Sequence, residues 1–314
     1  MKHAALSIEF DARVTAAFGR HLIVRDAEGR EYRARPMGRR LFVVCGDEVR
    51  CRLDERHGDV QAVRILPRRT ALYRSNLRGE AEPVVANLTQ LIVVLAPVPE
   101  PDLFIADRYL AAATSAGIAG ALVLNKIDLD GPGDELQGEL RAYEQAGYRW
   151  IACSARTGQG LDDLLRLCSG AISVLVGQSG VGKSSLVKRL VPSADVTIGE
   201  LARTEEGRHT TTASRLFELP ANGQLIDSPG VRDFAPAIDH LEPRSLGFVE
   251  VARLAPGCRF HDCKHMREPD CAVRAAAETG ALHPRRYESY KRTRRLYEEL
   301  IEAAGPGRRK PGAH

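Results

Sequence analysis

The chain has 314 residues, of which 44% are hydrophobic and 27% are charged, and its formal net charge is +4. This length predicts two or three domains, and the composition is that of a globular protein, which excludes a fibrous or wholly disordered chain. No apolar run approaches the roughly 18 residues that a membrane helix needs, and the N-terminal stretch lacks a signal-peptide pattern, so we expect no membrane partner.

Residues 1–76 alternate short β-type runs with turn signals. The runs are RHLIVRD, EYRARP, RLFVV, DEVRCRL and GDVQAVRIL. This spacing predicts a small antiparallel barrel or sandwich. Up to Gly79 there are 17 Arg and Lys against 10 Asp and Glu, which favours contact with nucleic acid, although a solvated charged surface explains it too. The stretch LPRRTALYRSNLRG has the composition of a basic linker.

Residues 77–238 alternate apolar strand patterns with amphipathic helix patterns. The expected strands are QLIVVLA, ALVLNK, YRWIACSA, AISVLV and GQLIDSPG, and the expected helices lie near 102–115, 134–146, 160–168 and 183–191. This alternation predicts a parallel sheet with helices on both faces. The flanking stretch SRLFELP is expected to be an antiparallel edge strand.

A glycine-rich phosphate loop follows the strand AISVLV and opens a helix. Glycines let several backbone N–H groups point at one phosphate chain, and the helix N-terminus adds partial positive charge. We expect Lys183 to reach the β- and γ-phosphates and the Ser184 hydroxyl to bind Mg²⁺; the alternative is an ordinary glycine-rich turn. The expected nucleotide-binding residues here are Gly177, Gln178, Ser179, Gly180, Val181, Gly182, Lys183, Ser184 and Ser185.

Asn125, Lys126 and Asp128 form an N-K-x-D motif after the strand ALVL. A carboxylate there accepts hydrogen bonds from guanine N1–H and its exocyclic amine, and a wrong base leaves that carboxylate unpaired. Ser154 and Ala155 end the next strand, where such a pair offers backbone N–H to the guanine oxygen. Either motif alone is equally well explained by a turn. Beside a phosphate loop, they predict GTP or GDP as the ligand.

Asp227 and Gly230 fit a D-x-x-G motif after GQLI. We expect Asp227 to hold Mg²⁺ through water and the Gly230 N–H to sense the γ-phosphate, although a simple turn explains the motif as well. The preceding segment GRHTTT offers Thr211, with Thr210 as the alternative, to cap Mg²⁺ and the γ-phosphate.

Val231 stands where many GTPases carry a glutamine that orients water. A valine cannot do so, and we therefore expect slow intrinsic hydrolysis or a different catalytic group. His209 is the candidate, with a solvated loop histidine as the alternative. The expected catalytic residues are His209, Thr211 and Lys183.

The motifs occur in the order N-K-x-D, S-A, phosphate loop, threonine segment, D-x-x-G, which is a rotation of the usual GTPase order. Ligand loops at the carboxyl ends of parallel strands adjoin whatever the order in which the chain visits them. Joining nearby termini and opening the chain elsewhere therefore preserves the site. The order predicts one circularly permuted domain.

Residues 239–314 contain a cysteine cluster, a charged helical stretch PRRYESYKRTRRLYEELIEAAG and a tail expected to be disordered. Three thiolates and one imidazole match a closed tetrahedral Zn²⁺ site without room for substrate water, which disfavours a zinc enzyme. His261 is an alternative to the histidine ligand. Clustered cysteines also indicate a reducing cytoplasm. The expected zinc ligands are Cys258, Cys263, His265 and Cys271.

With these residues assembled, the chain resembles the bacterial ribosome small-subunit-dependent GTPase A family over nearly its whole length. The resemblance rests on NKID, GQSGVGKSS, GRHTTT, DSPG and the zinc motif. It implies an N-terminal β-barrel of OB type at 1–76, a central α/β circularly permuted P-loop GTPase domain at 77–238, and a C-terminal α-helical zinc-binding domain at 239–314.

The resemblance also implies GTP hydrolysis that is stimulated by the small ribosomal subunit during its late maturation, with contacts to rRNA and release after hydrolysis. We expect a cytoplasmic monomer. The alternative is a GTP-dependent binding module in which the nucleotide acts as a latch and hydrolysis is incidental. The stretch RRYESYKRTRR offers a second basic face for RNA contact, with a solvated charged surface as the alternative.

Overall fold

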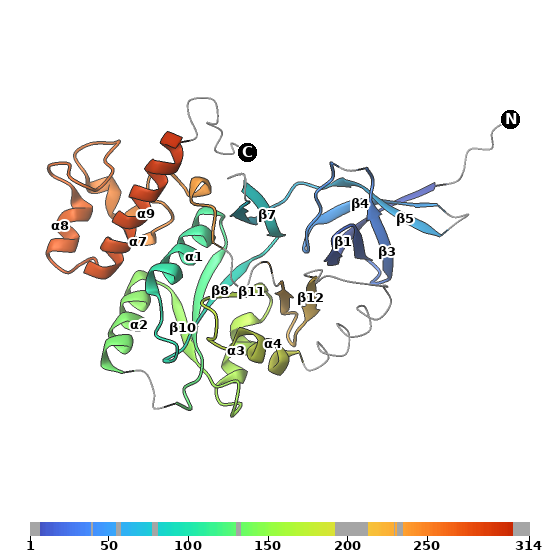
Figure 1. Cartoon of the computed structure of the whole chain (residues 1–314), viewed down its shortest axis with the longest axis horizontal. Helices are drawn as coiled ribbons and strands as arrows, with labels where there is room; N and C mark the ends of the chain where they lie inside the picture. The colour runs from blue at the N-terminus through green and yellow to red at the C-terminus, as the bar shows by residue number, and fades with distance from the viewer. Residues whose placement is uncertain are drawn as a thin grey trace.

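A computed structural model of the protein describes residues 7–38, 40–54, 58–76, 81–129, 133–191, 213–228, 230 and 235–303. Figure 1 shows an N-terminal β-barrel at one end, an α/β layer in the middle and a group of C-terminal helices at the other end. No described helix is long and apolar enough to cross a membrane. The multidomain fold predicted from the sequence is confirmed.

The barrel consists of β1 (Ser7–Phe18), β2 (His21–Asp26), β3 (Glu31–Pro36), β4 (Glu48–Asp54) and β5 (Asp59–Ile65). It closes because β1 pairs with both β2 and β4, while β5 pairs with β3 and β4. Alternate side chains such as Val14, Val24 and Val49 fill its core. The long β1 was not predicted, since its charged and small residues obscure the alternation. The expected strand RLFVV is wrong: the Asp47 carboxylate accepts from Val44 N at 2.9 Å and turns the chain there.

The stretch expected as a basic linker contains a hairpin. β6 (Ala71–Ser75) and β7 (Ala81–Ala86) pair antiparallel, and Leu72 and Val85 are buried in the core beneath the central sheet. The linker prediction was wrong because the arginines of this stretch outweighed its apolar positions. The predicted domain boundary at residue 76 lies between the two strands.

The central sheet has five parallel strands in the order β10-β9-β8-β11-β13. They are β8 (Gln90–Leu95), β9 (Ala119–Leu124), β10 (Arg149–Ala152), β11 (Ile172–Val176) and β13 (Gln224–Asp227). Alternate residues of β8 belong to two separate cores, one with helices α1 (Leu103–Ser115) and α2 (Asp134–Ala146), the other with α3 (Leu161–Cys168) and α4 (Lys183–Leu190). The predicted sheet with helices on both faces is confirmed.

Strand β12 (Ser214–Glu218) runs antiparallel to β13, as predicted, but it is not an edge. Its other side pairs with β1 at Ala16 and Ala17, so the barrel and the central sheet form one continuous eleven-stranded sheet. Arg25 of the barrel reinforces this junction through an ion pair with Glu218 at 2.7 Å. The sequence pattern of β12 gave no sign of a partner about two hundred residues away in the chain.

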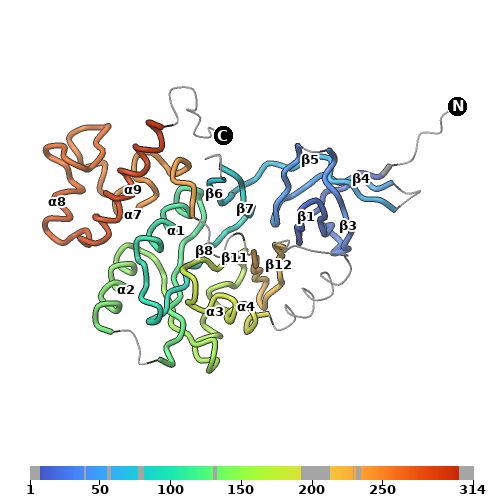
Figure 2. Tube along the Cα trace, in the orientation of Figure 1, coloured from blue at the N-terminus to red at the C-terminus, as the bar shows by residue number. Residues whose placement is uncertain are grey.

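The C-terminal part consists of the 3₁₀ turn η1 (Ile238–His240), helix α7 (Val249–Leu254), the turn η2 (Ala255–Gly257), and helices α8 (Ala272–Glu278) and α9 (Pro284–Ala303). Phe248, Val251 and Tyr290 form its core together with Ala111 of α1. Figure 2 shows α9 beside α1, so this part packs directly on a helix of the central layer.

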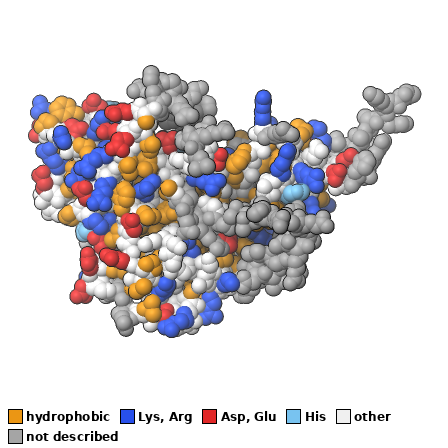
Figure 3. Space-filling view, viewed as in Figure 1, with side chains coloured by type: hydrophobic (Ala, Val, Ile, Leu, Met, Phe, Trp, Pro, Cys, Tyr) orange, Lys and Arg blue, Asp and Glu red, His pale blue; other side chains and the backbone are white. Residues whose placement is uncertain are grey.

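The predicted basic face of α9 is wrong in part. Arg286 and Arg294 are only 1% and 4% exposed, and Arg285 is held by acidic residues of α1 and α2. Arg292 and Arg295 remain exposed. Figure 3 shows Lys and Arg side chains on both the barrel and the C-terminal helices, interspersed with acidic ones. Half of the helix's basic side chains therefore serve packing within the protein.

Candidate functional site

The segments after the parallel strands converge on one edge of the sheet. Asn125 follows β9, Ser154 follows β10, Gly177 follows β11, and Asp227 ends β13. Because these strands are parallel and adjacent, their carboxyl ends lie side by side. The motifs, although permuted along the chain, therefore lie at the same edge of the sheet, as predicted.

Asn125 connects three of these segments. It is buried, its Nδ2 donates to Val181 O of the phosphate loop at 2.8 Å, and its Oδ1 accepts from Ala155 N at 3.0 Å. Lys126 adds a second connection, since its Nζ donates to Gly180 O at 2.6 Å and to Val98 O at 2.9 Å. The base motif, the S-A pair and the phosphate loop therefore form one hydrogen-bonded unit.

Gly182 is required by this close approach. Its φ is +97°, and a Cβ there would lie 2.3 Å from Asn125 Nδ2. Gly177 is constrained in the same way, with φ at +139° and a Cβ position 2.4 Å from Val94 O. Larger residues at either position would push the phosphate loop away from the sheet.

Asp128 lies beside the S-A pair. Its carboxylate accepts from the Ser154 hydroxyl and is paired with Arg156, a side chain that is 71% exposed. The Ser154 hydrogen bond, followed by those of Arg156, lowers the pKa of Asp128 below its ordinary value. The carboxylate is therefore ionised at neutral pH, as recognition of two guanine N–H groups requires, and a base would replace the contact with the exposed Arg156.

Lys183 lies inside the phosphate loop and is 6% exposed, with Nζ donating to Gly177 O and Gln178 O at 2.7 Å each. Its ammonium is therefore already placed where the loop would receive a phosphate. Ser184 and Ser185 are exposed at the start of α4. The Ser184 hydroxyl and the Asp227 carboxylate are oxygen donors of the kind that Mg²⁺ prefers, so the chain's residues fit that ion.

The D-x-x-G motif continues this edge. Asp227 is buried, and Ser228 Oγ is 2.7 Å from Ser214 Oγ, which joins the motif to β12 directly after the threonine segment. Gly230 lies against the β6–β7 hairpin near Val84 and Arg74. His209, Thr210, Thr211 and Val231 lie outside the described residues, so their predicted roles stay predictions.

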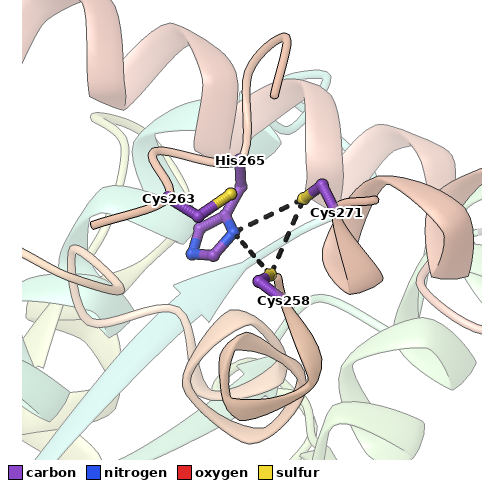
Figure 4. Close-up of side chains that lie close together, drawn as sticks. All are labelled: Cys258, Cys263, His265 and Cys271. Carbon is purple, nitrogen blue, oxygen red and sulfur yellow. Dashed lines mark hydrogen bonds between the residues drawn. The ribbon is translucent and has the colours of Figure 1, made fainter. Parts of the chain in front are cut away.

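The four predicted zinc ligands lie together in the C-terminal part, with their donor atoms within 4.8 Å of one another. Figure 4 shows them facing a common centre; Cys258 Sγ is 3.8 Å from Cys271 Sγ and 3.4 Å from His265 Nδ1. Tetrahedral bonds of about 2.3 Å place sulfur donors about 3.8 Å apart, so this donor set fits Zn²⁺. His261 instead lies 2.8 Å from Arg244 through its Nε2. His265, and not His261, is therefore the histidine of the donor cluster.

The loop that carries these ligands is organised by its own polar groups. Glu268 accepts from the backbone N–H of Lys264, Met266 and Arg267 at 2.9 Å each. Burial opposes its ionisation, but these donors dominate and lower the pKa of Glu268 to about 2. Tyr287 of α9 donates to His265 O at 2.8 Å and so ties the loop to the long helix.

A family model described as RsgA GTPase matches residues 65–236. The small ribosomal subunit biogenesis GTPase RsgA of Ectopseudomonas mendocina (strain ymp) is 45% identical over 252 residues, which cover 79% of this chain and 73% of the relative. The protein of the same name from Pseudomonas aeruginosa (strain LESB58) is 42% identical over 289 residues, covering 91% and 85%. The chain belongs to the RsgA GTPase family.

Solved structures agree with this RsgA-family assignment. The crystal structure of YjeQ from Thermotoga maritima has a TM-score of 0.70 and 28% identity, and the match covers 96% of this chain and 100% of that one. YloQ, described as a circularly permuted GTPase, has the same TM-score with 22% identity, which speaks for the fold alone. The family model confirms the GTPase assignment. The chain order β9, β10, β11 and β13, with these strands parallel in one sheet, confirms the predicted circular permutation.

Several residues of this RsgA-family site were not predicted from the sequence. The Val98 carbonyl accepts a hydrogen bond from Lys126, and Arg156 forms an ion pair with the Asp128 carboxylate. Arg189 of α4 donates to Ala155 O at 2.9 Å and so ties the S-A loop to the helix that follows the phosphate loop. The loop after β8 carries no motif of its own, and single arginines have no spacing signal. Only their position at the shared edge identifies them.

Proposed function

We propose that the protein hydrolyses GTP to GDP and phosphate in a cycle that depends on the small ribosomal subunit and acts in its late maturation, after which the protein dissociates. The observation that carries the nucleotide part is the double bridge of Asn125 and Lys126 from the base motif to the phosphate loop. This bridge supports a single binding unit in which the Asp128 carboxylate reads the base while the phosphate loop holds the phosphates. The subunit part rests on the names of the relatives.

The contacts of the described residues support most of the residue roles in this proposal, and those of Thr211 and His209 rest on the sequence motif. Asp128 binds the base, with Ser154 and Ala155 beside it; Asn125 and Lys126 hold the base and phosphate segments together. The phosphate loop from Gly177 to Ser185 binds the phosphates, and Lys183 supplies positive charge to them. Ser184, Thr211 and Asp227 would hold Mg²⁺, which supplies charge neutralisation between the β- and γ-phosphates. His209 is proposed to orient water in place of a glutamine.

Zinc is proposed to have a structural role. Four protein ligands leave no open position for a substrate, and the segment between Cys258 and Cys271 contains few apolar residues. Metal binding would therefore contribute folding free energy to this segment. The ligands are Cys258, Cys263, His265 and Cys271.

The decisive experiment measures multiple-turnover hydrolysis of GTP and ATP with and without purified small subunits. We expect the protein to hydrolyse GTP but not ATP, and we expect the rate of GTP hydrolysis to rise strongly when small subunits are added. Comparable ATP turnover would contradict the base assignment. A second candidate function, a GTP-dependent latch, is favoured by Val231 in place of glutamine; GTP-dependent subunit binding without stimulated hydrolysis would identify it.

A further inference from the structure

A cavity of about 230 Å³ lies beside the phosphate loop. It is lined by residues of α1 including Arg108, by residues 177–179 of the loop, and by Ala235 and Pro236, which follow the D-x-x-G motif. A single water takes about 30 Å³ of liquid volume, so the cavity has room for a phosphoryl group with its hydration. It therefore lies between the first residues of the phosphate loop and the segment that follows the D-x-x-G motif.

Arg108 brings an incompletely satisfied charge to this cavity. Its Nε is buried without a hydrogen-bond partner, and its Nη2 makes only a long 3.4 Å contact with Pro236 O. No acidic side chain in the described part of the chain forms an ion pair with it, and burial lowers the pKa of its guanidinium. A guanidinium still carries its charge at neutral pH. A half-buried cation to which the described residues offer no anion is costly, which favours a role with an anionic ligand.

Contacts at Asp102 and at Asp107 hold the helix that carries Arg108 in place. At its start, the Asp102 backbone N–H donates to Gln178 Oε1 of the phosphate loop at 3.1 Å. One residue before Arg108, the buried Asp107 accepts from Arg286 at 2.6 Å and from the Tyr143 hydroxyl at 2.6 Å. Arg108 is therefore carried by a rigid support, as a preorganised electrostatic group must be.

We propose that Arg108 is a further catalytic residue, an arginine supplied by the same chain that donates to the γ-phosphoryl oxygens as they gain charge in the transition state. This inference rests on the proposed GTP hydrolysis. In that reaction water oxygen bonds to the γ-phosphorus, the bond from phosphorus to the β–γ bridging oxygen breaks, and GDP leaves with that electron pair. The proton that the water loses passes to the phosphate product or to solvent. Arg108 adds no proton and removes none; it stabilises the charge shared by these oxygens.

The test compares Arg108→Gln, Arg108→Lys and Arg108→Ala with a matched control, Arg292→Gln. Arg292 is the fitting control because its guanidinium also lies over the Phe104 ring, at 5.7 Å against 5.8 Å for Arg108, but it does not line the cavity. The measurements are GDP affinity, subunit-stimulated kcat, and trapping of GDP with aluminium fluoride, which mimics the transferring phosphoryl group.

We expect Arg108→Gln to lower stimulated kcat by at least about 100-fold, because arginine groups of this kind contribute about 10³–10⁵. GDP affinity should change by less than about threefold, and aluminium fluoride trapping should be lost. Arg108→Lys should recover little, since a point charge lacks the planar fork. Added guanidinium should restore part of the activity of Arg108→Ala, an effect that a folding role would not produce.

Two results would overturn the inference: wild-type turnover in Arg108→Gln, or a parallel loss of GDP affinity and turnover without rescue by guanidinium. Arg292→Gln must keep wild-type GDP affinity, aluminium fluoride trapping and turnover without subunits; its subunit-stimulated kcat is not used as a control, because Arg292 is exposed in the basic stretch expected to contact RNA. Failure of this inference is separable from failure of the proposed function. In the first case the unmodified protein still turns over GTP in preference to ATP, and in the second it does not.

Discussion

Replacing Asn125 with alanine tests whether the base and phosphate segments act as one unit. This side chain is 1% exposed, and both of its amide atoms are used: Nδ2 by Val181 O at 2.8 Å and Oδ1 by Ala155 N at 3.0 Å. The substitution removes these two hydrogen bonds and a weaker one from the Cys153 thiol at 3.9 Å, and it leaves one backbone carbonyl and one backbone N–H buried without these partners.

The size of the effect follows from these contacts. Each lost bond with an unsatisfied buried partner costs about 1–3 kcal/mol, so the free energy of unfolding should fall by about 2–4 kcal/mol after partial relaxation. The phosphate loop would also lose its anchor to the base motif, and nucleotide binding would have to restore that order. We expect GDP affinity to fall at least tenfold, which corresponds to a binding cost of about 1.4 kcal/mol.

The assay pairs Asn125→Ala with Asn87→Gly. Asn87 is likewise buried, with Nδ2 donating to Gly46 O at 2.8 Å and Oδ1 accepting from Arg69 N at 2.9 Å, but it lies in the junction of barrel and sheet. Glycine suits its φ of +56°. Denaturant unfolding should show both variants destabilised, whereas GDP titration should show weaker binding only for Asn125→Ala. If both variants kept wild-type GDP affinity, the bridge would have no part in binding.

Three further predictions concern the charge, the metal and the domain contact. Because the pKa of Asp128 is lowered, its carboxylate stays ionised well into the acid range, so the ratio of GDP to ADP affinity should be the same at pH 8 and pH 5; a fall in this ratio by pH 5 would contradict the lowered pKa. Removing zinc with a chelator, or replacing Cys271 with serine, should abolish hydrogen-exchange protection in residues 258–271 while GDP still binds, and retained protection would show that no metal supports the loop. Arg286→Met should lower the free energy of unfolding by about 3–5 kcal/mol, because Asp107 and Glu250 lose a buried partner; an unchanged denaturation midpoint would show that the network is dispensable.

The site was largely predictable because its chemistry depends on local spacing. A phosphate loop needs glycines, a lysine and a serine at fixed positions, and Asn125 and Asp128 lie three residues apart after a strand. Parallel strand order then places these segments at one edge without further information. The cluster of three cysteines and one histidine that could hold a metal is similarly predictable from residue type and spacing.

What could not be predicted depends on partners distant in sequence. The pairing of β12 with β1 joins Arg215 to Ala16, and neither residue indicates the other. The sequence of α9 is typical of an exposed basic helix. Arg286 is nevertheless buried, because it forms ion pairs with Asp107 of α1 and Glu250 of α7. Charge patterns along one helix cannot distinguish solvent from a buried acidic partner.

The central claim is that Asp128 reads a guanine base whose phosphates lie in the loop around Lys183, and the most direct measurement is the base preference of Asp128→Asn. GDP and xanthosine diphosphate are titrated against the unmodified protein and the variant. We predict that the unmodified protein favours GDP, and that the variant loses GDP affinity and gains affinity for xanthosine diphosphate, because an amide can donate to the 2-oxygen that replaces the amine of guanine. An unchanged preference for GDP in the variant would contradict the placement of both ends of one nucleotide at this edge of the sheet.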